Sequence, residues 1–291
     1  MKFRWLVKLA KTTVMKWWDD NVLRLSAALS FYTLFSLAPL LTIAVAMAGL
    51  VVDEKVVQDE VLGQFKDLIG APGADAIANM LASASQPVQG TIPTVVSLVT
   101  LIIVSMGMFG ELQDAFNLIW RITPQKGAPL WGVIKSRFLP FMLVIGTGLL
   151  LLGSLILSAV MAALSTFILQ AVPGPQMFLI VIDLAVSLPV ITLLFALMFK
   201  VFPDGYIAWM DVWLGAVASG TLFLIGKWLI GLYLGSTAMA SMYGAASSLM
   251  IILAWVYYSA LIFFWGAELT CVYAHEYGSR MALPRVTPSR V

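Results

Sequence analysis

Two opposite charges, Asp183 and Lys227, lie inside long apolar runs of a 291-residue chain. The runs cover residues 178–202 and 209–234, and the turn Pro203-Asp204-Gly205 separates them. Each run exceeds the roughly 20 residues that a helix needs to cross a bilayer. Both charges are equally distant from the turn, so a hairpin of antiparallel helices would hold them at the same depth. Because an unpaired charge inside a membrane is costly, we expect the carboxylate and the amine to pair.

Two interpretations of this pair are open. It could bind a polar group of a substrate or couple its movement, as charges within membranes commonly do. It could instead be a structural ion pair that sets the register of two helices, or Asp183 could be solvated near the outer interface. Small residues on the second run favour close helix packing, which would turn Lys227 toward protein. They are Ala216, Gly220, Gly231 and Gly235.

Further charges lie near the ends of the apolar runs, on what would be one side of the membrane. They could form an inner gate or a polar vestibule for a head group, or they could neutralise one another at the interface, where a charge costs little. Glu268 differs from the rest because it lies several residues inside its run and should be more desolvated. The other members are Arg24, Glu111, Asp114, Lys200 and Asp211, and Arg121 has a similar depth.

Two prolines, Pro39 and Pro189, lie near the middle of apolar runs. Proline removes one helical hydrogen bond and frees the carbonyl four residues earlier, so each position predicts a helix break. The stretches around them, 36–42 and 187–192, are similar to each other. Matching broken helices in two inverted halves are typical of transporters. Prolines are also common in membrane helices that have no such role, so both interpretations stay open.

The composition is that of a membrane protein. Hydrophobic residues make up 61% of the chain and charged residues 11%; the mean hydropathy is +0.96. A soluble globular domain does not need so much apolar surface. Cys271 is the single cysteine and excludes an internal disulfide, while His275, the single histidine, argues against a zinc or iron site built on imidazoles. We therefore expect no metal and no cofactor.

Six apolar runs predict six membrane-spanning helices within one domain, residues 1–291. Residues 1–23 predict an amphipathic helix on an anionic leaflet, or else a basic tail that only sets topology. Residues 53–91 are acidic and predict two short amphipathic helices broken at Gly70-Ala71-Pro72-Gly73. Most of the 17 lysines and arginines lie on the side of the termini, which predicts cytoplasmic termini and an external helical cap at 53–91. The runs are 25–52, 92–119, 138–169, 178–202, 209–234 and 246–274.

Several blocks of the chain resemble the YihY/BrkB family of bacterial inner-membrane proteins. They are RLSAALSFYTLFSLAPLL (24–41), FNLIWRI (116–122), FPDGYIAWMDVWLGAVASGTLFLIGKWLIGLYLG (202–235) and YGAASSLMIILAWVYYSALIFFWGAELTCVYA (243–274). The resemblance covers nearly the whole chain and implies a six-helix protein of the bacterial inner membrane. Some members of that family carry an old ribonuclease BN label. The residues argue against that activity, because no motif supplies a metal cluster or an acid–base pair.

The sequence thus predicts an all-α integral membrane protein and leaves two functional classes. The first is a carrier or flippase-like protein for an amphipathic or lipid-like substrate, with membrane lipids as partners. The second is a non-catalytic scaffold or envelope-integrity factor that acts through partner proteins. A carrier should contain a polar cavity lined by the charges above, whereas a scaffold should be packed solid there. We expect neither an enzyme nor nucleic-acid binding, because the cytoplasmic loops are too short for an RNA groove.

Overall fold

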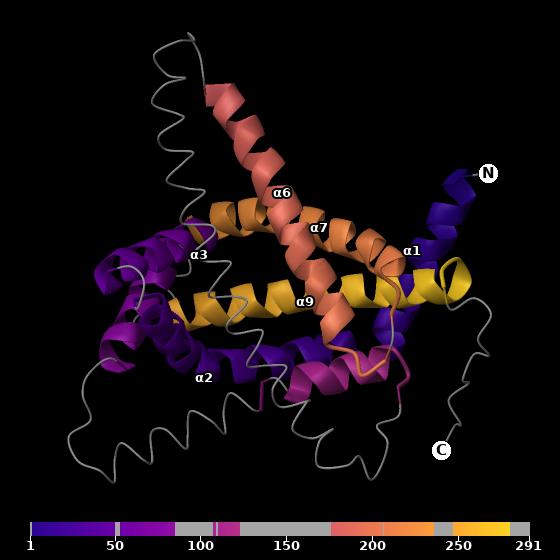
Figure 1. Ribbon diagram of the computed structural model, residues 1–291, viewed down its shortest axis with the longest axis horizontal. Coiled ribbons are helices and arrows are strands. Elements are labelled where there is room, and N and C mark those ends of the chain that lie inside the picture. The colour runs from indigo at the N-terminus through magenta and orange to yellow at the C-terminus, as the bar shows by residue number, and fades with distance from the viewer. Residues whose placement is uncertain are drawn as a thin grey trace.

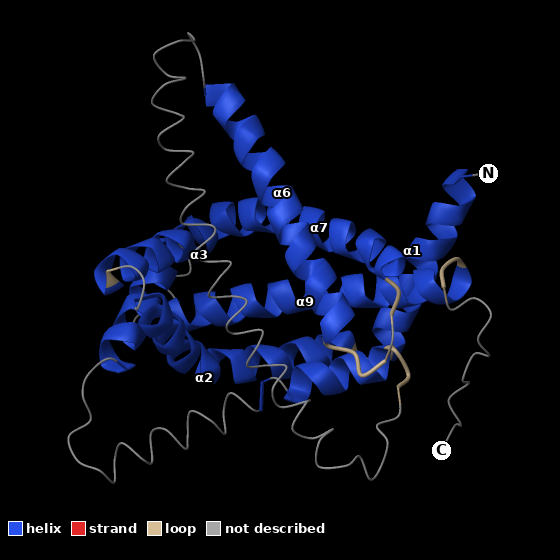
Figure 2. Ribbon diagram, viewed as in Figure 1, coloured by secondary structure: helices blue, strands red, loops and turns tan. Residues whose placement is uncertain are grey.

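The described part of the chain is built from helices alone. The computed structural model describes residues 2–49, 53–84, 107–108, 110–122, 176–205, 207–235 and 247–279, and these contain no strand. Figure 2 shows helices and a few loops in this part, which confirms the all-α prediction for it. The long helices are α1 (Lys2–Asp19), α2 (Val22–Gly49), α3 (Glu54–Ala84), α6 (Gln176–Val201), α7 (Trp209–Gly235) and α9 (Ser247–Glu276). A shorter helical segment covers 110–119.

Helix α9 is the centre of the described fold. Helices α1, α2, α3, α6 and α7 all contact it. Figure 1 shows α9 running between α2 and α7, with α3 at one end, α1 at the other, and α6 crossing α7. Residues 266–272 of α9 are buried without interruption. A stretch buried around its whole circumference must be covered on every side, and here other helices cover this part of α9.

Helix α1 forms within residues 1–23, where the sequence predicts a helix. Leu9 is buried against Leu269 and Val272 of α9. The exposed positions of α1 carry large apolar side chains as well as basic ones: Leu6, Val7, Val14, Met15, Trp18, Arg4, Lys8 and Lys11. Whether these positions rest on a membrane surface stays a prediction.

Helix α3 is divided at Gly70, within the stretch where the sequence predicts a break. Gly70 has φ 77° and ψ 172°, a combination that only glycine adopts readily. Apolar residues of both halves, among them Val57 and Ile77, are buried against Leu41 of α2 and Ile251 of α9. This contact covers the amino-terminal end of α9, whereas α1 covers its carboxy-terminal end (Figure 1). The external position of this cap is untested.

Two described helices are long and apolar enough to cross a membrane: Trp209–Lys227 in α7 and Leu249–Glu276 in α9. Shorter apolar stretches, Val22–Leu37 and Ser187–Val201, lie in α2 and α6. The predicted spans 92–119 and 138–169 fall largely or wholly outside the described residues. The bundle of six spanning helices and the side of the termini therefore stay predictions.

Small residues bring α7 and α9 close together. A side chain at Gly215 would collide with the backbone carbonyl of Gly266 and the hydroxyl of Thr270, and one at Gly266 would collide with Ser219. On the α6 side of α7, Gly220 lies against Thr192. Ala216 and Gly220 of the predicted small-residue stripe are buried, as expected; the burial of Gly231 and Gly235 lies outside what the structure describes.

Candidate functional site

A buried polar cluster forms where three elements meet near the carboxy-terminal end of α9. Asp20 comes from the turn between α1 and α2, Arg121 from the end of segment 110–122, and Glu268 from α9. Arg121 Nη2 lies 2.5 Å from Asp20 Oδ1. The Asp20 side chain is 3% exposed, whereas the Arg121 side chain is 38% exposed and reaches outward. We call these three residues the carboxyl cluster.

Glu268 has no accessible surface. Among the described residues, no N–H or O–H group donates to either of its carboxyl oxygens, nor to Oδ2 of Asp20. The Asp20 carboxyl group lies within hydrogen-bonding reach of Glu268. Two carboxyl groups therefore face each other in the interior, and one guanidinium group contacts the pair through Asp20. The sequence predicts a desolvated Glu268, and its complete burial agrees with that expectation.

The backbone conformation at Arg121 directs its side chain toward Asp20. Segment 110–119 ends in two hydrogen bonds, in which Arg121 N donates to Leu118 O at 3.1 Å and Ile122 N donates to Asn117 O at 2.8 Å. In this helix ending, the residue at the position of Arg121 takes the left-handed conformation and is usually glycine. Arg121 takes it with φ 54°. An arginine there costs roughly 1–2 kcal/mol of backbone strain.

The turn between α6 and α7 is clamped to segment 110–119. Asp204 accepts hydrogen bonds from Gln113 Nε2 at 2.7 Å and Asn117 Nδ2 at 2.8 Å. The backbone N–H of Asp204 donates back to Asn117 Oδ1 at 3.1 Å. Of the predicted gate residues on this segment, Glu111 is half-buried and Asp114 is exposed. The side chains that join the segment to the turn are thus Gln113 and Asn117.

Asp211 and Lys200 make local contacts. Asp211 is buried, and both the N–H and the hydroxyl of Ser279 donate to its carboxylate. Lys200 Nζ donates to the carbonyl of Ile207 and lies 5.9 Å from the centre of the Trp209 ring. These contacts connect the end of α6 to the start of α7, and the start of α7 to the residues that follow α9.

The predicted pair of Asp183 and Lys227 stays a prediction. Lys227 is half-buried on α7, and Asp183 belongs to α6, but its side chain lies outside what the structure describes. Arg24 is exposed on α2.

The two prolines do not divide their helices. Helix α6 continues from Gln176 to Val201 with Pro189 inside it, and Pro189 is exposed. Helix α2 likewise continues through position 39, while the side chain of Pro39 is outside the described part. The predicted helix breaks are therefore not seen as interruptions. A proline can be accommodated where its ring faces outward and the helix bends slightly around the missing hydrogen bond.

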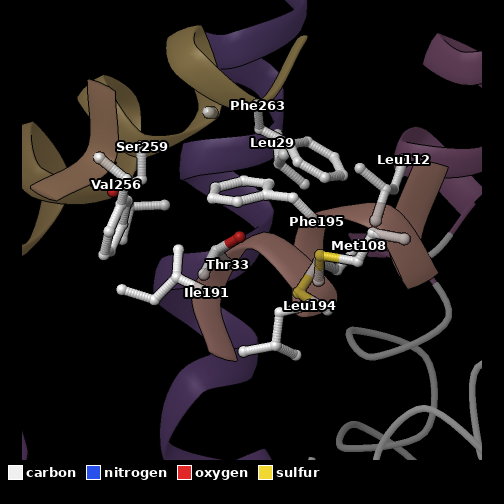
Figure 3. Close-up of a pocket in the computed structure, with 13 residues that line it drawn as sticks. Leu29, Thr33, Met108, Leu112, Ile191, Leu194, Phe195, Val256, Ser259 and Phe263 are labelled. Atoms are coloured by element: carbon white, nitrogen blue, oxygen red, sulfur yellow. The ribbon is translucent and has the colours of Figure 1, made fainter. Parts of the chain in front are cut away.

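An apolar cavity of about 340 Å³ lies between the helices. Figure 3 shows its side chains around an open centre, with Met108 and Leu112 on one side and Val256 and Ser259 on another. The lining includes one threonine and one serine and no charged residue. The polar cavity expected for a carrier is therefore not what the described residues form. The lining residues are Leu29, Thr33, Met108, Leu112, Ile191, Leu194, Phe195, Met198, Phe223, Val256, Ser259, Ala260 and Phe263.

The sequence did not identify Asp20 or the cavity. Asp20 lies in the tight turn Asp19-Asp20-Asn21, and a turn residue at a helix end is normally solvated. Only its contact with Arg121, a hundred residues away, marks it as buried. The described residues also hold no group of three or more histidine, cysteine or acidic residues that could bind a metal ion.

Comparison with known proteins identifies the family of this chain. The family model described as "Virulence factor BrkB" matches residues 13–288. The chain belongs to the BrkB family. Its relatives named "UPF0761 membrane protein" include one from Pseudomonas aeruginosa, 27% identical over 292 residues, and one from Azotobacter vinelandii, 28% identical over 276 residues. These names and the long apolar helices make it a membrane protein, as the resemblance implies.

The chain is shorter than these relatives. The alignments cover 96% and 90% of this chain but 66% and 62% of the Pseudomonas and Azotobacter proteins. No solved structure matches the chain.

Proposed function

We propose that this BrkB-family protein is a carrier or flippase-like protein of the bacterial inner membrane, with an amphipathic, lipid-like substrate. The observation that carries the proposal is the apolar cavity between α2, α6, α7 and α9. Its volume of about 340 Å³ lies at the lower end of the range of roughly 300–1,000 Å³ for small-molecule sites. Protein interiors are normally close-packed, so an apolar space of this size between helices suits a bound ligand.

The apolar lining of the cavity favours the binding of a hydrocarbon chain. An acyl chain leaves the bilayer and enters an apolar cavity with little change in solvation, because lipid tails are as apolar as leucine. A polar solute would lose its hydrogen bonds to water and find only Thr33 and Ser259 in return. The cavity therefore suits the tail of a lipid-like substrate. In this proposal Asp183 and Lys227 bind the polar head group of the substrate or couple its movement. Both termini lie in the cytoplasm.

The test is crosslinking by a phospholipid that carries a photoactivatable group on its acyl chain. The protein is held in nanodiscs, and the labelled residues are identified by mass spectrometry. We expect labelling of cavity residues such as Leu194 and Val256. The variant Ser259→Phe, which fills the cavity, should reduce that labelling at least several-fold.

The matched control is Val217→Phe, at an exposed position on α7. It adds a ring to the outer surface and should leave the labelling of the cavity unchanged. Equal labelling of the cavity in wild type and Ser259→Phe, with most label on outer positions such as Leu193, would refute the proposal. The same pair of variants in a lipid-translocation assay with vesicles separates a carrier from a protein that only binds lipid.

A scaffold is the second candidate, and one observation favours it. Asp211 and Lys200, which were predicted to gate a pathway, are engaged in contacts with Ser279 and Ile207. Such contacts serve packing without any substrate. Lys227→Met distinguishes the two functions, because a carrier that uses Lys227 loses translocation while a scaffold keeps its function in a complementation assay.

A further inference from the structure

We propose that Asp20 and Glu268 bind one proton between them, forming a buried protonation site at the junction of α1, α9 and segment 110–122. The ligand is a proton, and the site is separate from the apolar cavity. It does not depend on the proposed lipid carriage, because it rests only on the carboxyl cluster.

The first argument is burial without donors. Glu268 has 0% and Asp20 5% of its surface exposed. No described N–H or O–H group reaches three of their four carboxyl oxygens, namely both oxygens of Glu268 and Oδ2 of Asp20. A buried ionised carboxylate without a hydrogen bond costs several kcal/mol or more, and native proteins avoid it. A proton held by one carboxyl group supplies the missing donor, because a protonated carboxyl group donates to its neighbour.

The second argument is the balance of charge. The charged groups that act on Glu268 are Asp20 from the α1–α2 turn, Lys16 from α1 and Arg121 from segment 110–122. Arg121 forms an ion pair with Asp20. Among the described residues, Lys16 forms no ion pair with either carboxyl group. Arg121 contacts Asp20 alone and Lys16 acts on Glu268 without contact, so no described cation contacts the Glu268 carboxyl group, and a shared proton neutralises the charge there.

The site lies beside aromatic contacts that extend to the cavity. Without the proton, two like charges would face each other inside the protein and repel. Phe116, on the segment that ends in Arg121, packs against Phe263 of α9 with ring centres 5.3 Å apart. Phe263 lines the cavity and precedes Glu268 by five residues, which is about 7.5 Å along a helix. The protonation site and the cavity thus both include residues of α9 and of segment 110–122.

Infrared difference spectroscopy on the full chain in nanodiscs tests this site. At neutral pH, the wild-type spectrum minus that of Glu268→Gln should show the carbonyl band of a protonated carboxylic acid. Asp20→Asn should remove the same band, because the amide donates the hydrogen bond in place of the proton. Glu111→Gln changes a half-buried glutamate on segment 110–119 and should leave the band unchanged.

Both amide variants keep the shape of the side chain, so Asp20→Asn carries the test if Glu268→Gln does not fold. Absence of the band from the difference spectrum of a folded variant would overturn the proposal. Binding of sodium by a carboxylate pair is the other outcome that would overturn the proposal. In that case the melting temperature would rise with added sodium but not with choline, and Glu268→Gln would abolish this rise. Release of one proton per chain on alkalinisation, measured with an indicator dye and lost in both variants, would support it.

Discussion

Arg121 adopts a backbone conformation that favours glycine, and its ion pair with Asp20 offsets the backbone strain. The strain of roughly 1–2 kcal/mol is smaller than the cost of leaving a buried carboxylate unpaired, which is about 3–5 kcal/mol when one partner of a buried pair is removed. The second left-handed position, Asn21 with φ 52°, is an asparagine, which tolerates this conformation better. The two positions differ because only Arg121 forms an ion pair there.

Replacing Arg121 by glycine should lower the free energy of unfolding by about 2 kcal/mol, because the lost ion pair outweighs the relieved backbone strain. Thermal unfolding of the detergent-solubilised protein measures the change. Asn21→Gly is the control, since it keeps the left-handed turn and removes no ion pair, and it should change stability little. An Arg121→Gly variant as stable as the wild type would show that the contact with Asp20 contributes nothing.

At the scale of helices, the packing of α7 on α9 depends on the absence of side chains. Gly215 and Gly266 let the two backbones approach, and Ser219 and Thr270 fill the space beside them. Small residues at such contacts are typical of helices that associate in membranes, where close packing replaces the hydrophobic effect.

Gly215→Ala should destabilise the protein by about 1–3 kcal/mol, because the added methyl group meets the backbone of Gly266, which can move only if the helices separate. Gly63→Ala is the matched control in α3, where nothing lies within 4 Å of the new methyl group. It should stabilise the helix by roughly 0.5–1 kcal/mol. The two melting temperatures should therefore move in opposite directions, and a Gly215→Ala protein that melts no lower than the wild type would contradict the close α7–α9 contact.

At the scale of the whole molecule, α1 and α3 cover opposite ends of α9 (Figure 1). Most of the polar contacts described above gather at the α1 end: the carboxyl cluster, the Asp204 clamp, and the contacts of Asp211 and Lys200. At the α3 end, the buried contact between α2, α3 and α9 is apolar. The predicted topology, with the basic side in the cytoplasm, stays a prediction.

Cysteine labelling tests that topology. Arg4→Cys and Asp59→Cys place thiols at exposed positions of α1 and α3. Cys271 is buried and should react slowly. With a membrane-impermeant maleimide, we expect position 4 to be labelled in inside-out vesicles and position 59 in right-side-out vesicles. Labelling of both positions from one side would refute the predicted topology.

The positions of the described helices could be predicted from the chain, because hydropathy and turn residues act locally. The predicted runs 25–52, 178–202, 209–234 and 246–274 correspond to α2, α6, α7 and α9 within a few residues. The break in α3 follows from a glycine in the predicted stretch. The burial of Glu268 could also be anticipated, because its distance from the end of a long apolar helix can be read from the chain.

The surroundings of these residues could not be predicted, because they depend on contacts between distant parts of the chain. The partner of Glu268 is Asp20, and the residue that neutralises Asp20 is Arg121, so the carboxyl cluster joins three elements that are far apart in the chain. The cavity likewise takes its lining from α2, α6, α7, α9 and residues 108 and 112. Both features depend on how side chains of separate helices pack together, and a local pattern of residues holds no information on those distances.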